Sequence, residues 1–101
     1  MAIGKQSERE ITKAIRGTLK VLGIFHWKVL QGLGSTPGVP DILGIFDKKM
    51  LAIEVKTEKG KLSDHQQRFL DRINREGGIA FVARSIDDVI DGLGVRDRFL
   101  I

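Results

Sequence analysis

The chain contains no cysteine and no long apolar stretch. The absence of cysteine excludes disulfides, thiolate zinc sites and cysteine nucleophiles, and it indicates a reducing compartment. No run approaches the roughly 20 apolar residues that cross a bilayer, and residues 1–5 lack the apolar core of a signal peptide. We therefore expect a protein of the cytoplasm with no membrane association.

The length of the chain indicates how many domains it forms, and its charge indicates the kind of partner it could bind. A chain of 101 residues is expected to form a single domain, residues 1–101, with one core. The net charge is +4, and the basic residues are spread along the chain without a low-complexity tail. This charge suits a polyanionic partner but does not by itself identify nucleic acid.

Apolar spacing, serine caps and glycines predict the element order αβββαβα. Three helices are expected, each after a serine: after Ser7 up to Gly23, after Ser63 to about residue 76 and after Ser85 to about residue 91. Strands are expected in the segments between them, at 25–30, 41–46, 50–56 and 79–83. A central hairpin followed by a crossover helix predicts an α/β fold, with a mixed four-stranded sheet flanked by helices.

Charged residues occur where the apolar pattern of this hairpin should continue. With a turn at residues 47–49, antiparallel pairing brings Asp41 opposite Val55 or Lys56, so that Asp41 and Glu54 converge at one end of the hairpin. Two neighbouring carboxylates repel each other and raise a pKa unless a divalent cation neutralises them. Oxygen ligands without a nearby thiolate favour Mg²⁺ or Mn²⁺.

Lys56 is expected on the same face of its strand as Glu54, because side chains alternate along a strand. A metal at the carboxylates can generate hydroxide from bound water and stabilise a phosphorane-like transition state. Lys56 could then orient or deprotonate that water, or hold the phosphate. The alternative is an ordinary hairpin with a surface ion pair between Glu54 and Lys56.

Two polar residues are expected on the sheet-facing sides of helices. At about 100° per residue, Glu8 falls within roughly 60° of the apolar stripe of the first helix, whereas Glu10 lies roughly 100 to 140° away. Glu10 completes a capping box with Ser7, so we favour Glu8 as the buried acid of the site, although acids suit any first helical turn. In the second helix Gln66 faces the sheet, and as the third residue after Ser63 it caps the helix, joins the site or does both.

With these residues in place, the chain resembles the VRR-NUC family of the PD-(D/E)XK nuclease superfamily, in its stand-alone bacterial and phage type. Five segments carry the resemblance in order: Glu8 before Ile11, Gly38-Val39-Pro40-Asp41 as the PD motif, Ile53-Glu54-Val55-Lys56-Thr57 as the ExK motif, Lys59 to Ser63 with Gln66, and Gly77-Gly78 with Val82-Ala83-Arg84-Ser85. The last segment departs from the family's usual Val-Arg pairing, since Ala83 stands beside Arg84, where no proposed catalytic group lies.

The resemblance implies a role for each of the site residues. Asp41, Glu54 and the Val55 backbone carbonyl would hold the metal, with Glu8 supporting it directly or through water. Lys56 and Gln66 would position the nucleophile and the phosphate. It also implies a restriction-endonuclease-like core and a homodimeric, structure-selective DNA endonuclease that acts on four-way (Holliday) junctions.

Several residues near the site are candidates for contact with DNA. Lys28, Lys59 and Lys61 could bind phosphates without reading sequence, or they could be solvated surface charges. Trp27 alternates with Phe25 and is expected to pack in the core, with base stacking as the alternative. The C-terminal segment 99–101 could contribute to a dimer contact or to the core.

The leading hypothesis is an Mg²⁺- or Mn²⁺-dependent DNA endonuclease that acts as a homodimer on branched DNA, encoded by a bacterium or a phage and working in the bacterial cytoplasm. One alternative is a catalytically idle nucleic-acid-binding module of a phage or repair complex. The acids argue against it, because binding alone does not need carboxylates beside phosphates. Another alternative is a restriction-type nuclease, but 101 residues leave little room for a separate recognition element.

Overall fold

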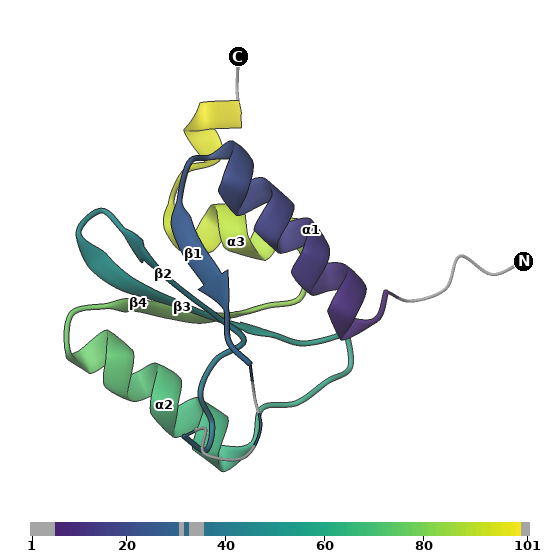
Figure 1. Ribbon diagram of the computed structural model, residues 1–101, viewed down its shortest axis with the longest axis vertical. Coiled ribbons are helices and arrows are strands. Elements are labelled where there is room, and N and C mark those ends of the chain that lie inside the picture. Colours follow the sequence, from purple (N-terminus) through teal and green to yellow (C-terminus); the bar gives the residue numbers. More distant parts are fainter. Residues whose placement is uncertain (1–5, 31, 33–35, 100–101) are drawn as a thin grey trace, which may run out of the picture.

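The computed structural model describes residues 6–30, 32 and 36–99, without the side chain of Phe99. Its elements are α1 (Glu8–Val21), β1 (Phe25–Lys28), β2 (Ile42–Phe46), β3 (Lys49–Val55), α2 (Asp64–Arg75), β4 (Ile79–Ala83), α3 (Ile86–Leu93) and the 3-10 helix η1 (Arg96–Phe99). The predicted order αβββαβα is confirmed, with η1 added (Figure 1). The residues proposed for a C-terminal dimer contact lie outside the described side chains.

The three predicted serine N-caps are all present, because each hydroxyl accepts a hydrogen bond from the backbone N–H three residues later. These bonds join Ser7 to Glu10, Ser63 to Gln66 and Ser85 to Asp88. In the described part of the chain, no helix combines the length and the apolar character that crossing a membrane requires.

The strands form one mixed sheet in the order β1-β2-β3-β4, with antiparallel pairing among β1, β2 and β3 and parallel pairing between β3 and β4. Helices α1 and α3 cover one face and α2 covers the other (Figure 1). Alternation along β3 sends Leu51, Ile53 and Val55 into the core under α1 and α3, while Ala52 packs under α2. Glu54 therefore belongs to the α2 side of the sheet.

The hairpin between β2 and β3 has a two-residue turn. Phe46 pairs with Lys49, so only Asp47 and Lys48 form the turn, with φ of 53° and 65°. Positive φ at both positions is typical of a two-residue type I′ turn. The predicted pairing of Asp41 with Val55 or Lys56 is therefore wrong by one or two residues, because continuing the register past Ile42 and Ile53 places Asp41 beside Glu54.

The prediction that Trp27 packs in the core is also wrong. Trp27 is 44% exposed and Phe25 is 66% exposed. Both pair with residues of β2 on the α2 side of the sheet, but α2 lies over β3 and β4 and does not reach this edge. The outer half of the sheet face is therefore left uncovered.

Candidate active site

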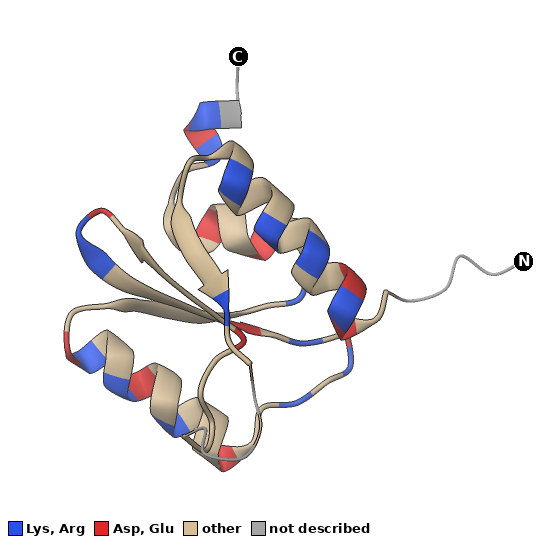
Figure 2. Cartoon of the chain, in the orientation of Figure 1, with Lys and Arg blue, Asp and Glu red and all other residues tan. Residues whose placement is uncertain are grey.

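The two predicted acids meet where β2 begins and β3 ends. Figure 2 shows acidic residues at this end of the sheet, between the first turns of α1 and α2. The Val55 backbone N–H donates a 2.8 Å hydrogen bond to Asp41 Oδ2, which fixes the Asp41 carboxyl against β3. Glu54 is only 2% exposed, and its carboxyl interacts directly with that of Asp41. The convergence expected from the hairpin is thus present.

The surroundings of Glu54 in the folded protein disfavour the ionised form of its carboxyl. Burial, followed by the hydrogen bond to and the repulsion from Asp41, raises the pKa of Glu54 from 4.5 to about 8. Lys56 opposes this increase, since its Nζ lies 3.9 Å from Glu54 Oε2, but the opposition is weaker than burial. No N–H or O–H group among the described residues donates to the buried Oε1 of Glu54.

Gln66 serves the helix cap and the acidic pair together. Its Oε1 accepts a 2.9 Å hydrogen bond from the Ser63 backbone N–H, which completes the capping box of α2. Its Nε2 donates to Glu54 Oε2 at 3.2 Å. The expectation that one side chain could do both is confirmed for its contacts, since the amide has one acceptor end and one donor end.

These two contacts can be separated by mutation. Gln66→Ala should lower the free energy of unfolding by about 1 kcal/mol and lower the DNA cleavage expected from the sequence by roughly 10- to 100-fold, because it removes a cap and a partner of Glu54. Ser63→Ala is the matched control, with a similar loss of about 1 kcal/mol in stability but near-normal cleavage. Urea denaturation and initial cleavage rates measure both quantities. Equal cleavage rates for the two variants would confine Gln66 to the cap.

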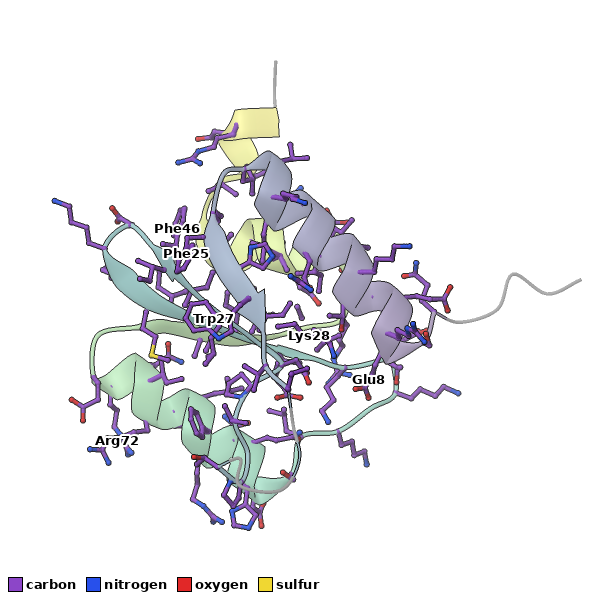
Figure 3. The ribbon with its side chains drawn as sticks, viewed as in Figure 1. Glu8, Phe25, Trp27, Lys28, Phe46 and Arg72 are labelled. Carbon is purple, nitrogen blue, oxygen red and sulfur yellow. The ribbon has the colours of Figure 1, made fainter. Side chains whose placement is uncertain are left out.

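Glu8 lies in the first turn of α1 and lines the same groove as Asp41. Its negative charge also raises the pKa of Glu54, but by less than burial and Asp41 raise it and by less than Lys56 lowers it. Glu10 instead accepts a 3.0 Å hydrogen bond from the Ser7 backbone N–H, as the predicted capping box requires. The expectation that Glu8 is buried is wrong: its side chain is exposed, because it overhangs the open groove beside Lys28 (Figure 3).

The lysines proposed to contact DNA fall in two places. Lys28 ends β1 and lines the groove with Glu8, whereas Lys59 and Lys61 are exposed on the loop between β3 and α2. Arg84 orders this loop, since its guanidinium donates to the carbonyls of Thr57 at 2.6 Å, Glu58 at 3.3 Å and Gly60 at 2.7 Å. The sequence marked Arg84 only as part of a motif and gave no signal for this role.

Arg84→Ala should lower the free energy of unfolding by about 2 to 3 kcal/mol, because three carbonyl groups lose a charged donor. Arg72→Ala is the control, since Arg72 forms an exposed ion pair with Glu76, and such pairs contribute about 0 to 1 kcal/mol. Urea denaturation compares the two variants, and limited proteolysis checks whether the loop at residues 57–60 becomes the new cleavage point. Similar losses for both variants would contradict this role.

The chemistry of the acidic pair fits a bound divalent cation. An ion there would supply the partner that Glu54 Oε1 lacks among the described residues, and it would offset the repulsion between the two acids. Within the described residues, no three side chains of His, Cys, Asp or Glu gather into a set that could hold a metal. Further ligands would therefore be main-chain oxygens or water, which is common for Mg²⁺.

The fold and site together define a nuclease-type α/β domain, with two acids and a lysine at one end of a mixed sheet. The model of the VRR-NUC domain family matches residues 5–87. This chain therefore belongs to the VRR-NUC family.

Solved structures agree with this assignment. One described as a VRR-NUC domain is 28% identical, with a TM-score of 0.71 over 88% of this chain and 96% of that one. A second, described as a VRR-NUC domain protein, is 20% identical and has a TM-score of 0.72 over 90% of this chain and 88% of that one, which supports the fold. No protein with a curated description matches the chain.

Proposed function

We propose that this protein is an Mg²⁺- or Mn²⁺-dependent DNA endonuclease that hydrolyses phosphodiester bonds. The observation that carries the proposal is the buried Glu54 carboxyl, which lies against Asp41 and has an oxygen without a hydrogen-bond donor among the described residues. An acid kept in this state destabilises the metal-free fold, which is typical of functional sites.

Each site residue has a part in this proposal. Asp41, Glu54 and the Val55 carbonyl oxygen would hold the ion, with Glu8 acting through a water, since no third acid gathers with them among the described residues. A bound divalent ion supplies hydroxide from water and stabilises charge on the phosphate. The Lys56 side chain, 13% exposed and 3.9 Å from Glu54, positions the attacking water or binds the phosphate as an ammonium, or deprotonates that water as a neutral amine. Gln66 fixes the orientation of Glu54.

The proposal is tested with a labelled four-way junction, a flap and a linear duplex, each with Mg²⁺, Mn²⁺ or a chelator. We expect cleavage with either metal, none with the chelator, and fastest cleavage of the junction. Lys56→Ala should remove cleavage while Lys49→Ala, which changes an exposed lysine at the other end of β3, should retain it. If DNA binds but no metal supports cleavage of any of the three, the protein is not a nuclease.

We further propose that the protein acts as a homodimer, since one chain carries one site and cutting two strands symmetrically needs two. An exposed apolar face of the sheet supports this, because such faces commonly mark contacts between proteins. Its residues, which we call the β1–β2 face, are Phe25, Trp27, Ile45 and Met50. Phe25 and Trp27 lie side by side on β1, with ring centroids 5.6 Å apart (Figure 3).

We also expect the protein to act in the bacterial cytoplasm, where its proposed DNA substrate would be found.

Trp27→Glu should convert the dimer to a monomer, because a charge placed on the β1–β2 face would be buried without a partner. Val21→Glu is the control, since Val21 is 84% exposed on α1, away from this face. Sedimentation should give twice the chain mass of 11.2 kDa for the unmodified protein and the control, and 11.2 kDa for Trp27→Glu. A dimer that survives Trp27→Glu would place the contact elsewhere.

A further inference from the structure

A groove of about 650 Å³ extends from Asp41 along α1. Its acidic end carries Glu8 and Asp41, which belong to the site already described. Its remaining charges are all positive: Arg9, Lys13 and Arg16 from α1, and Lys28 from β1. Four cations therefore continue directly from the position at which a phosphodiester would be cut.

The cations of α1 form a stripe rather than a scatter. Arg9, Lys13 and Arg16 follow one another at spacings of four and three residues, which places them on one side of a helix. Figure 2 shows basic residues along this helix and acidic ones only in its first turn. Among the described residues, none of these three forms an ion pair with an acid. Their charge is thus available to an external anion.

Arg16 lines the groove with a guanidinium that is only partly buried. Its Nε is buried and therefore closed to an external ligand, so contact with an anion in the groove falls to the two terminal nitrogens of the guanidinium. A phosphate suits these two nitrogens well, because the planar guanidinium fork matches phosphate geometry.

The length of the stripe matches a short piece of nucleic-acid backbone. Arg16 lies seven residues beyond Arg9, which is about 10 Å along the helix axis. B-DNA advances 3.4 Å along its axis per nucleotide of one strand, so this length corresponds to roughly three nucleotides. Given the nuclease function proposed above, on which this step rests, we propose that the α1 groove holds the sugar-phosphate backbone of the cleaved strand beside the scissile bond. Arg9, Lys13, Arg16 and Lys28 contact successive phosphates without reading the bases.

Binding measured without cleavage tests this assignment. Fluorescence anisotropy of a labelled 20-base-pair duplex and a four-way junction, in a chelator and over a range of salt, compares Lys13→Gln/Arg16→Gln with Lys48→Gln/Lys49→Gln. The control pair removes the same charge from exposed positions at the turn end of the hairpin, since Lys48 is in the turn and Lys49 begins β3. The groove pair should weaken binding on the order of 10- to 100-fold and reduce the slope of log K against log salt by about 2, since each phosphate contact contributes about 0.9. The control pair should change both much less.

A conservative exchange separates geometry from charge. Arg16→Lys should bind more weakly than the unmodified protein, because a guanidinium can bind a phosphate through two nitrogens and an ammonium cannot, whereas Lys13→Arg loses no contact and should bind normally. If the double variant in α1 fails to fold, Arg9→Gln/Lys28→Gln removes the other two cations of the groove and should give the same loss. Equal effects of groove and turn variants, or no DNA binding at all, overturn the assignment. Cleavage by the unmodified protein is scored separately, so the nuclease function and the groove can fail independently.

Discussion

Glu54→Gln is expected to stabilise the metal-free protein at pH 9 by on the order of 3 kcal/mol and to lower cleavage by roughly 10³-fold or more. The two effects have one origin. The buried carboxyl is costly to ionise in the folded state, where burial and Asp41 raise its pKa from 4.5 to about 8. The same carboxyl would be needed, ionised, to hold a metal.

The sign of the pH dependence follows from the direction of this shift. Between pH 4.5 and about 8 the folded state keeps a proton on Glu54 that the unfolded state has lost. The free energy of unfolding therefore falls as the pH rises through this window, and it becomes independent of this group above it. Glutamine stays neutral, so the advantage of Glu54→Gln should grow from about pH 4.5 to about 8 and then level off.

Urea denaturation at pH 5, 7 and 9 in a chelator measures this difference. Glu58→Gln is the control, because Glu58 is exposed in the following loop, and its stability should stay parallel to that of the unmodified protein. Adding Mg²⁺ should stabilise the unmodified protein at pH 7 and not Glu54→Gln, since only the former keeps both carboxylates. If the difference in free energy of unfolding between Glu54→Gln and the unmodified protein is constant across the three pH values, the fold does not raise the pKa of Glu54.

Local signals predicted most of the fold. The serine caps, the glycines and the alternation along β3 depend on residues close in sequence, and each is present in the structure. The hairpin register was less accessible, because Asp47 and Lys48 lack the glycine that usually marks a type I′ turn. The convergence of Asp41 and Glu54 did not depend on the exact register of the hairpin. The acidic pair was therefore predicted, although the residue opposite Asp41 was not.

Other features depend on contacts between distant segments. Trp27 has the alternating neighbours of a core residue, yet its burial depends on how far α2 extends across the sheet. Arg84 binds carbonyls 24 to 27 residues earlier in the chain, and no local pattern reports such a contact. The helical angle of Glu8 predicted its direction but not its exposure, which is set by the open groove.

The two acids of the first turn of α1 should separate in function. Glu8→Ala should lower cleavage by roughly 10- to 100-fold with little change in stability, because an exposed acid that orients water or metal contributes mainly to the site. Glu10→Ala should lower the free energy of unfolding and leave cleavage nearly intact, since the Glu10 carboxylate accepts a hydrogen bond from the Ser7 backbone N–H.

Cleavage rates and urea denaturation on both variants give a crossed comparison in which each residue is the other's control. The substitutions remove the same charge from the same turn, two residues apart, so a general effect of the helix dipole would lower both cleavage rates alike. Equal rates would therefore remove Glu8 from the site, and a slower Glu10→Ala would show that the other acid serves it. The predicted asymmetry arises because a helix turns by about 100° per residue, which directs Glu8 toward Asp41 and Glu10 toward its cap.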